Sequence, residues 1–445
     1  MMSRTRSRYG RREFLKSGIV AAGAVALPRW FVEETAAEGF EEARSPNERA
    51  RILLVGCGGM GKGDAKNATR FGDIVAVCDV DANRAEATKA ELKAERTFGD
   101  FRTALDEKRI DVVINATPDH WHTLINLAAL RAGKDIYSEK PLTLTIDEGK
   151  KLVSVVRETK RILQTGSQQR SDARFRLACE LVRNHRLGKL QRIITTLPAG
   201  PVGGPFRSKD IPAGLDWDFW LGQAPKVEYV PERCHMTFRF WLDYSGGTIT
   251  DWGAHHNDIA QWANGTERSG PITVQGEVLA SPIAGGYETP PLYQVEYTYA
   301  NGVSLTCKTV AHESFYGQPT RELKPGDERN GVRFEGQDGW IFVTRGHIEA
   351  SNPELLSAEL PADAERLYVS NDHMGNFFEC VRTREAPICE AEIGHRSVSV
   401  CHLGSIALRT GRKLLWNPER ERFVDDADAD RYLAREMRAP WRLDG

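Results

Sequence analysis

The types of three side chains, Lys140, Asp251 and His255, would suit them to handle the proton of a hydroxyl group. A histidine with its ordinary pKa of about 6.5 is largely neutral near physiological pH, so its imidazole can accept a proton. A lysine ammonium can stabilise an alkoxide as it develops. A carboxylate can orient the imidazole or hydrogen-bond a substrate. This combination fits oxidation of a secondary alcohol, in which the hydroxyl proton leaves as a hydride departs from carbon.

The elements around these residues decide whether the side chains can meet. Asp251 stands four residues before His255, so the two share a face if the segment is helical. Asp251 could instead be an ordinary N-cap, because residues 248–251 precede a plausible helix. Lys140 follows an expected short strand at 135–138, within Glu139-Lys140-Pro141, and this position alone permits many roles.

A glycine-rich segment directly follows the first expected strand, at 51–55. Gly56 allows a tight turn, Gly58 lets the backbone approach a pyrophosphate, and Gly61 lets the next helix pack closely on the strand. The N-terminus of that helix would face the negative charge. A lone G-x-G-x-x-G is a weak signal, but its place between a strand and a helical segment predicts a dinucleotide-binding βαβ unit.

Asp79 ends the next expected strand, at 74–79, and could select between cofactors. A carboxylate there can accept hydrogen bonds from the adenosine ribose, and it repels a 2′-phosphate. No arginine occurs at 80–83, so the sequence favours NAD over NADP, although Arg84 is near enough to leave NADP open. The alternative is that Asp79 is a plain turn residue.

The remaining periodicity predicts two domains with different sheets. Strands at 110–116, 135–138 and 161–164, separated by helical segments, complete a parallel doubly wound Rossmann sheet. Later alternating runs predict an α+β domain with a mainly antiparallel sheet. We therefore expect four parts, namely a leader and linker at 1–45, an NAD-binding domain at 50–170, a substrate and oligomerisation domain at 171–412, and a C-terminal tail at 413–445 that lies across a surface or a partner subunit.

Composition argues against several kinds of ligand. The chain has 445 residues, 40% of them hydrophobic, and a formal charge of -2, so nothing favours nucleic acid. Cys57 and Cys78 fall in apolar or Gly-rich surroundings that predict buried free thiols, and no disulfide framework is expected. The cysteines lack zinc spacing, and His120 and His122 stand on an expected loop without a partner at ligand spacing. We expect no metal.

The first thirty residues resemble a targeting segment. Arg11-Arg12 is followed by Glu-Phe-Leu-Lys and then by a small-residue apolar run at 18–27 that is too short for a stable transmembrane span. This pattern is similar to a twin-arginine signal, which implies the twin-arginine export machinery as a partner and a periplasmic or otherwise exported protein. The alternative is a frayed basic terminus. Because this route exports folded proteins, we expect the cofactor to be loaded inside the cell and tightly bound.

Taken together, the motifs resemble the Gfo/Idh/MocA oxidoreductases over roughly residues 51–412. The resemblance rests on the Gly56 to Gly61 loop, Ala116-Thr117-Pro118 with His122, Glu139-Lys140-Pro141, Gly246-Gly247, and the Asp251 to Asp258 motif. It implies a Rossmann domain followed by an α+β domain whose open antiparallel sheet forms the substrate wall and often the interface of a homo-oligomer.

The resemblance also implies roles for particular residues. Lys140 would reach the nicotinamide ribose and the substrate hydroxyl, while Asp251 and His255 would come from the second domain. We assign His255 as base, Lys140 as electrostatic partner and Asp251 as orienter, with the first two roles exchangeable. Residues expected along the nicotinamide half of the cofactor are Thr117, Pro118, His122, Glu139 and, more weakly, Gln168. His312 and Tyr316 lie on an expected loop where substrate contacts often occur in the family.

Three functions fit these residues. The first is an NAD-dependent oxidoreductase acting on a hydroxyl of a sugar, polyol or glycoside. The second is an exported glycosidase or lyase in which NAD is reduced and reoxidised in each turnover through a transient keto-sugar. The third is a non-catalytic NAD-binding regulator, against which the presence of Lys140, Asp251 and His255 argues.

Overall fold

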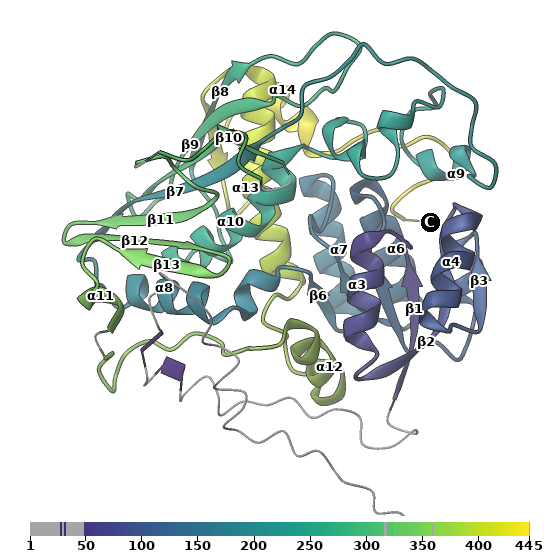
Figure 1. Cartoon of the computed structure of the whole chain (residues 1–445), viewed down its shortest axis with the longest axis horizontal. Coiled ribbons are helices and arrows are strands. Elements are labelled where there is room, and N and C mark those ends of the chain that lie inside the picture. The colour runs from purple at the N-terminus through teal and green to yellow at the C-terminus, as the bar shows by residue number, and fades with distance from the viewer. Residues whose placement is uncertain are drawn as a thin grey trace, which may run out of the picture.

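The structure is a computed structural model that describes residues 27–28, 31–32, 49–315, 318–324, 326–357 and 359–444. The expected twin-arginine segment lies outside these residues. Two lobes lie side by side, each built on its own sheet, with helices of both lobes between the two sheets (Figure 1). The lobes correspond to the expected Rossmann and α+β domains.

The first lobe carries a parallel sheet in the order β3-β2-β1-β4-β5-β6. Its central strands are apolar and buried over most of their length, as a sheet covered by helices on both faces requires. The strands are β1 (Ala50–Val55), β2 (Gly72–Cys78), β3 (Arg96–Phe98), β4 (Val112–Asn115), β5 (Asp135–Ser138) and β6 (Leu163–Thr165). The predicted doubly wound sheet is confirmed.

Helices follow each of the first five strands of this sheet. They are α3 (Gly59–Ala68), α4 (Ala82–Leu92), α5 (Phe101–Leu105), α6 (Asp119–Arg131) and α7 (Ile146–Thr159). The expected loop around His120 and His122 is wrong, because both residues lie in the first turn of α6. Pro118 occupies the N-cap and Asp119 opens the helix, so the helix begins as soon as β4 ends.

The second lobe carries a larger sheet in the order β13-β12-β11-β7-β10-β9-β8-β14-β15. Most neighbours are antiparallel, as predicted, but β10 pairs with β7 in parallel. The strands are β7 (Leu190–Ala199), β8 (Thr273–Ala280), β9 (Leu292–Thr298), β10 (Ser304–Ser314), β11 (Gly331–Gly336), β12 (Gly339–Thr344), β13 (His347–Ala350), β14 (Leu414–Asn417) and β15 (Arg422–Phe423).

One face of this sheet is covered by α8 (Ala173–Arg183), α10 (Thr248–Asn264) and α13 (Ala391–Thr410). Their apolar side chains share a core with the inward side chains of the strands, including Phe175, Trp262 and Leu403. The other face carries charged residues, among them Arg192 of β7, Arg333 and Glu335 of β11 and Glu349 of β13, around a surface groove of about 610 Å³. The expected open, mainly antiparallel sheet is therefore present. Shorter helices are η2 (Gln168–Ser171), α9 (Trp217–Leu221), η3 (Pro231–Arg233), η4 (Thr237–Phe240), α11 (Glu354–Ser357), α14 (Ala427–Asp430) and η5 (Arg431–Leu433).

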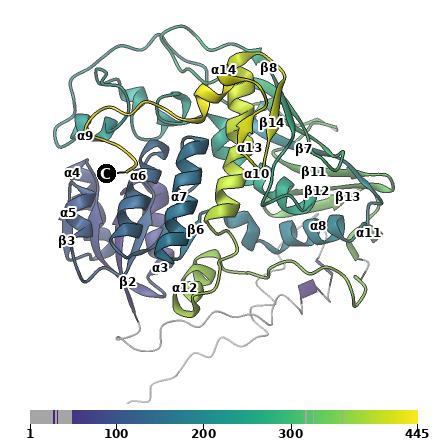
Figure 2. The same cartoon turned by 180° about the vertical axis from the view of Figure 1, so that it is seen from behind.

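Helix α12 (His373–Thr383) belongs to the second domain by sequence but packs on the first lobe (Figure 2). Phe377 and Phe378 lie in one buried cluster with Ile52 of β1, and Phe378 stacks on Phe71 with ring centroids 5.1 Å apart. α13 then contributes Ala391 and Val398 to the cluster on the other side of the Rossmann sheet. The chain thus returns to the first lobe after building most of the second.

The segment expected as a tail begins with a strand. β14 joins the edge of the second sheet beside β8, and β15 pairs with it. After η5 the chain leaves the sheet and runs across to α9 and α6 of the other half, as the yellow end of the ribbon shows in Figure 2.

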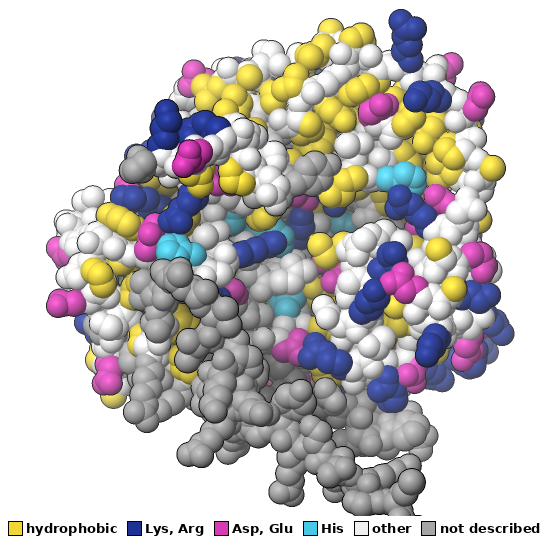
Figure 3. Space-filling view, viewed as in Figure 1, with side chains coloured by type: hydrophobic (Ala, Val, Ile, Leu, Met, Phe, Trp, Pro, Cys, Tyr) yellow, Lys and Arg dark blue, Asp and Glu magenta, His cyan; other side chains and the backbone are white. Residues whose placement is uncertain are grey.

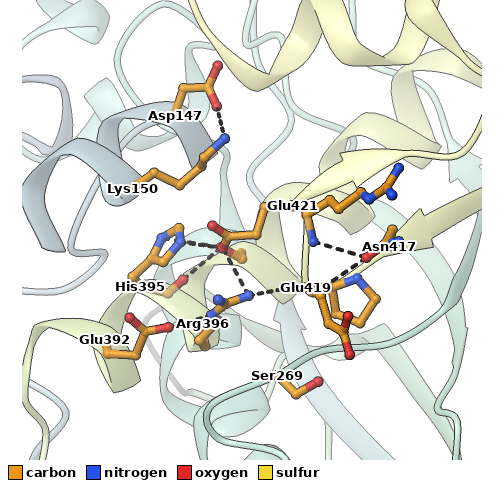
Figure 4. Close-up of polar contacts among 12 residues, drawn as sticks. Asp147, Lys150, Ser269, Glu392, His395, Arg396, Asn417, Glu419 and Glu421 are labelled. Carbon is orange, nitrogen blue, oxygen red and sulfur yellow. Dashed lines mark hydrogen bonds and ion pairs between the residues drawn. The ribbon is translucent and has the colours of Figure 1, made fainter. Parts of the chain in front are cut away.

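A buried ionic cluster fixes the turn between β14 and β15 onto α13 (Figure 4). Glu421 accepts a hydrogen bond from His395 Nε2 at 2.6 Å and lies 3.0 Å from Nη1 of Arg396. Arg396 also donates to Glu392 at 2.7 Å. The His395 side chain is 2% exposed and that of Glu421 is 9% exposed, so water screens little of this interaction.

All eight cysteines are free and buried, as expected for Cys57 and Cys78. Among the helices that the structure describes, none is long and apolar enough to cross a membrane. In the same part of the chain, no group of three or more His, Cys, Asp or Glu side chains is placed to hold a metal ion.

Candidate active site

The glycine-rich turn forms a cradle in front of α3. Gly56 has φ +94°, and a Cβ there would lie 2.5 Å from the carbonyl oxygen of Ala116 on the neighbouring strand end. A Cβ on Gly61 would lie 2.1 Å from the Gly56 carbonyl oxygen. Gly58, the N-cap of α3, faces open space, since a Cβ there would meet only Arg84 Nη1, at 4.0 Å. Backbone N–H groups at the helix start are therefore open to a phosphate.

Asp79 anchors this turn from the end of β2. Its carboxylate accepts hydrogen bonds from the backbone N–H of Cys57 at 2.8 Å and of Asp81 at 2.9 Å. Asp79 also lines the cavity in front of the turn, with Arg84 beside it. Asp79 thus holds the turn, as expected of a turn residue. It also lines the cavity, as expected of a residue that selects the cofactor.

The cavity has a volume of about 390 Å³ and runs from Asp79 past the glycine turn to Thr117 and Pro118. Apolar side chains line the end of the cavity near Asp79, and backbone N–H groups of the glycine turn face its middle. Such a lining suits an adenine at one end and a pyrophosphate at the centre. The residues present therefore fit a dinucleotide. The apolar wall consists of Phe101, Trp121, Ile125, Leu215 and Phe219.

The second domain covers this cavity with residues 213–239, which we call the cover segment. They lie in the long connection between β7 and α10, and Figure 1 shows α9 of this segment beside α4. The backbone N–H of Ala82 donates to Gly214 O at 2.9 Å, and that of Asp216 donates to Val80 O at 3.0 Å. Leu215, Phe219 and Phe238 of the cover segment contribute to the cavity wall.

The aromatic residues noted in this region are mostly packed together. Trp217, Trp220, Phe238, Trp241 and Tyr244 are buried in a cluster of their own. Their rings therefore shape the cover segment, and core packing describes them better than an exposed surface for stacking a sugar does.

Two of the predicted catalytic residues, Lys140 and Asp251, contact each other next to a residue that lines the cavity. Lys140 Nζ donates to Asp251 Oδ1 at 2.6 Å, and both side chains are about one-tenth exposed. Arg239, which lines the cavity, donates from Nε to the same oxygen at 3.1 Å. Burial by itself raises the pKa of Asp251, but Lys140 and Arg239 outweigh this effect and leave the pKa below its usual value. Asp251 is therefore a carboxylate held between two cations.

His255 lies one turn after Asp251 on α10 and is 5% exposed. Its Nδ1 atom is buried and has no hydrogen-bond partner among the described residues. Burial lowers the pKa of His255 well below its usual value, and the charges of Lys140 and Arg345 lower it further. The imidazole is therefore neutral at physiological pH, and its unpartnered nitrogen can accept a proton.

Asp251 does not orient His255 as we expected. Within the described chain its carboxylate bonds to Lys140 and Arg239, and none of its hydrogen bonds goes to the imidazole. The two residues do lie in the same helix, but Asp251 is in the first turn, where it faces the strand end that carries Lys140. The carboxylate thus positions the lysine.

The residues predicted along the nicotinamide half form a hydrogen-bonded frame behind Lys140. The ring nitrogens of His122 lie 2.7 Å from Pro141 O and 2.9 Å from Thr117 O, so the single N–H of the neutral ring donates to one of these strand ends while the ring packs against the other. Gln168 donates to Glu139 at 2.8 Å. Burial raises the pKa of Glu139, whose neighbour Asp64 on α3 has its own pKa raised by burial and by Glu139.

Sequence reasoning missed several groups that share this site. Asp119 accepts a hydrogen bond from Ser245 Oγ at 2.5 Å, and burial raises its pKa to about 7. Asp64 and Arg239 were also missed. A charged residue within an apolar stretch was the available signal for Arg239, in Phe238-Arg239-Phe240. Figure 3 shows lysine, arginine and histidine side chains in the hollow between the two lobes.

Two further residues, Arg345 and His312, lie on the second sheet or in its turns. Arg345, in the turn between β12 and β13, places its guanidinium 4.9 Å from the ring centroid of Trp252. It is not ion-paired within the described residues. The expected loop position of His312 is wrong, because the residue lies in β10, where its ring Nε2 is 2.6 Å from the carbonyl oxygen of Glu328. Tyr316 lies outside the described residues.

Family comparison places this site in context. The model described as "Oxidoreductase family, NAD-binding Rossmann fold" matches residues 50–167. The model described as "Oxidoreductase family, C-terminal alpha/beta domain" matches residues 204–443, more than half of the chain. The chain belongs to the Gfo/Idh/MocA oxidoreductase family. This membership confirms the expected enzyme class, an NAD-binding oxidoreductase acting on CH–OH groups.

Similar proteins support the same class. The chain is 26% identical over 350 residues to scyllo-inositol 2-dehydrogenase (NAD(+)) of Bacillus subtilis, covering 76% of this chain and 88% of that protein. It is 32% identical over 190 residues to inositol 2-dehydrogenase of Rhizobium meliloti, covering 39% of this chain and 56% of that protein. The fold matches the WlbA dehydrogenase of Bordetella pertussis, solved with NADH and UDP-GlcNAcA, with a TM-score of 0.62 at 17% identity over 83% of this chain and 99% of that one.

Proposed function

We propose that the protein transfers a hydride between a CH–OH group of a sugar, polyol or glycoside and NAD, with His255 and Lys140 handling the hydroxyl proton. The observation that carries the proposal is the neutral, buried imidazole of His255, whose Nδ1 lacks a partner beside the Lys140–Asp251 pair. A nicotinamide bound at this end of the cavity would supply the hydride acceptor.

Each side chain has a distinct part in the proposed reaction. His255 accepts the hydroxyl proton, because its low pKa leaves the imidazole unprotonated. Lys140 stabilises the oxygen as negative charge develops, and Asp251 holds the ammonium in place with Arg239. NAD as the cofactor, and its tight binding, rest on the placement of Asp79 at the adenosine end and on the cover segment.

The substrate class draws support from the relatives. Two of the similar proteins are named inositol 2-dehydrogenases, so a cyclic polyol or a sugar ring is the first class to test. The groove beside β7, β11 and β12 supports a homo-oligomer, since it leaves charged residues of the open sheet face available to another copy.

The decisive experiment mixes purified holoprotein with a panel of inositols, aldoses and glycosides. The absorbance of the reduced nicotinamide is followed together with release of free sugar. Lasting reduction without cleavage supports the dehydrogenase. Lys140→Met should retain the cofactor but lose at least about 100-fold in turnover, as removal of an electrostatic partner does, whereas Lys108→Met, at an exposed lysine in the turn between α5 and β4, should leave turnover unchanged. Substantial turnover in Lys140→Met would contradict the assignment.

A redox-neutral lyase or glycosidase is the second candidate, and the covered cofactor cavity favours it. If the dinucleotide stays bound, the substrate can be oxidised and the keto intermediate reduced again during a single binding event of the substrate. Sugar release without net change in the nicotinamide absorbance supports this candidate, and no response across the panel supports a non-catalytic regulator.

We also propose that the twin-arginine-like segment directs export to the periplasm. Its support is the Arg11-Arg12 pair followed by a short apolar run. Replacing both arginines by lysine should retain the protein in the cytoplasmic fraction, and unchanged fractionation would overturn the proposal.

A further inference from the structure

The last part of the chain, residues 434–444, forms a strap between the cover segment and the Rossmann helices (Figure 2). Arg438 makes four hydrogen bonds to the cover segment. Its backbone N–H donates to Gln223 O at 2.9 Å and its Nε donates to Gly222 O at 2.9 Å. Its two terminal nitrogens donate to the carboxylate and the carbonyl of Asp218 at 2.7 Å and 2.8 Å.

Trp441 of the strap lies behind the adenosine wall of the cavity. Its ring stacks on Phe219 at 5.6 Å and 10°, and it meets the edge of Trp121 at 4.8 Å and 86°. Phe101 lies 6.5 Å away, and Arg102 places its guanidinium over the indole at 5.0 Å. Phe101, Trp121 and Phe219 line the cavity with their other sides. Trp441 therefore joins a cover residue, Phe219, to two residues of the first domain.

The end of the strap is fastened to the Rossmann helices. Leu443 O accepts a hydrogen bond from Arg131 of α6 at 3.1 Å, and Asp444 lies 2.5 Å from Lys151 of α7. A dinucleotide in the cavity would lie beneath the cover segment, with Thr117 and Trp121 on one side and Leu215 and Phe219 on the other. Separation of the cover segment from the first domain would open the cavity further. Because Trp441 contacts both sides and Arg438 fastens the strap to the cover segment, this movement breaks contacts of the strap.

From this arrangement we propose that the strap latches the cover segment and makes dissociation of NAD slow, so that the cofactor stays bound between turnovers. The inference rests on the dinucleotide site of the proposed function. It assigns cofactor retention to residues outside the motifs that bind the dinucleotide. Arg438 and Trp441 act as positioning residues, because they hold the wall and the cover and do not line the cavity themselves.

The test measures how fast bound NAD leaves the full-length holoprotein after mixing with excess fluorescent NAD analogue. Trp441→Ala and Arg438→Met should each raise the dissociation rate by at least about tenfold, since Trp441 joins the cover segment to the first domain and Arg438 fastens the strap to the cover segment. Two matched controls should leave the rate unchanged. Arg442→Met removes an exposed arginine of the same strap, and Trp340→Ala removes a tryptophan on the open sheet face.

The outcomes separate the strap from the cofactor site. Rates within about twofold of wild type in both strap variants would overturn the inference while leaving the proposed function intact. A wild-type protein that binds no NAD would overturn the dinucleotide site, and with it both proposals. If the cofactor-free variants unfold at the same temperature as wild type, faster release of NAD does not reflect a misfolded domain.

Discussion

The carboxylate of Asp251 lies between two cations, one helical turn before a histidine whose pKa is lowered chiefly by burial. One negative charge on Asp251 faces the positive charges of Lys140 and Arg239. Arg345 adds a further positive charge near His255. Burial disfavours the charged imidazolium, and the surplus of positive charge disfavours it again. At the scale of the residue, the site is arranged to keep a base unprotonated.

A pH profile tests this account. Because the pKa of His255 is lowered below its ordinary value of 6.5, its neutral form persists as the pH falls through 6.5. Single-turnover reduction of bound NAD by a reactive polyol should therefore lose its rate only below pH 6.5. Measurement of the rate constant from acidic to neutral pH locates this acidic limb, and a limb above pH 6.5 would exclude His255 as the base.

Removing Arg345 should move that limb. Arg345→Met takes away a positive charge that lowers the pKa of His255, so the pKa should rise and the acidic limb should shift to higher pH. Arg329→Met is a suitable control, because Arg329 pairs with Glu349 at 2.5 Å and stacks on Phe342. Identical profiles for Arg345→Met and wild type would show that the field of this arginine does not reach the base.

At the scale of elements, the first turn of α3 depends on the absence of a side chain at Gly61. A Cβ there would lie 2.1 Å from the carbonyl oxygen of Gly56, so the helix or the turn must move. Gly63, two residues later in the same helix, has nothing within 4 Å of its Cβ position and is exposed. Alanine at Gly61 therefore tests close packing, whereas alanine at Gly63 tests helix propensity.

Gly61→Ala should cost about 1–3 kcal/mol in the free energy of unfolding and weaken NAD binding, as overpacking against backbone does. Gly63→Ala should stabilise the protein by up to about 1 kcal/mol, because alanine favours the helix. Chemical denaturation and NAD titration of both variants provide the measurements. Equal stability of the two variants would mean that α3 shifts freely against β1.

The turn between β14 and β15 gives a second test at this scale. Glu421→Gln removes the charge that faces His395 and Arg396 in a buried cluster. The expected loss is about 1.5–3 kcal/mol, typical of hydrogen bonds to a charged group. Glu419→Gln, an exposed change of the same kind in the same turn, should stay within about 0.5 kcal/mol of wild type. Denaturant unfolding compares them, and equal losses would point to the turn rather than the ionic cluster.

Local pattern predicted the apolar strands of the first sheet and the alternating strands of the second, and it missed short strands that are partly exposed. The apolar runs that became β1, β2 and β4 were recognisable because covered parallel strands are apolar throughout. β3 and β13 are short and partly exposed, so no run marks them. Lys140, Asp251 and His255 were found by their motifs, whereas Arg239 reaches the site only because the cover segment folds back over another domain.

At the scale of the whole molecule, the first domain is not complete within its own stretch of sequence, because a helix from later in the chain packs on it. α12 supplies Met374, Phe377 and Phe378 to a buried cluster with the first strands of the Rossmann sheet. Arg70 of the first lobe also lies 2.5 Å from Asp372 at the start of α12. The local sequence of α12 carries no information about which of the two sheets this helix covers.

A fragment that ends at residue 170 should therefore lack a cooperative unfolding transition, since its sheet would expose the surface that α12 covers. In the full chain, Phe377→Ala should cost about 3–5 kcal/mol, because Phe377 is fully buried. Leu415→Ala, at a side chain that is 50% exposed, should cost little. Urea unfolding followed by circular dichroism measures the stability of the fragment and of the two variants. A fragment as stable as the whole protein would contradict the shared core.

The return of α12 also fixes when the first domain can become stable during synthesis. Chains emerge from the ribosome with the N-terminal part first, and domains generally fold as units when their residues are available. The Rossmann strands are complete by residue 165, but the helix that covers one of their faces ends only at residue 383. The dinucleotide-binding domain is thus synthesised first but completed late. The apolar surface that α12 will cover must be shielded from solvent while more than two hundred further residues are translated.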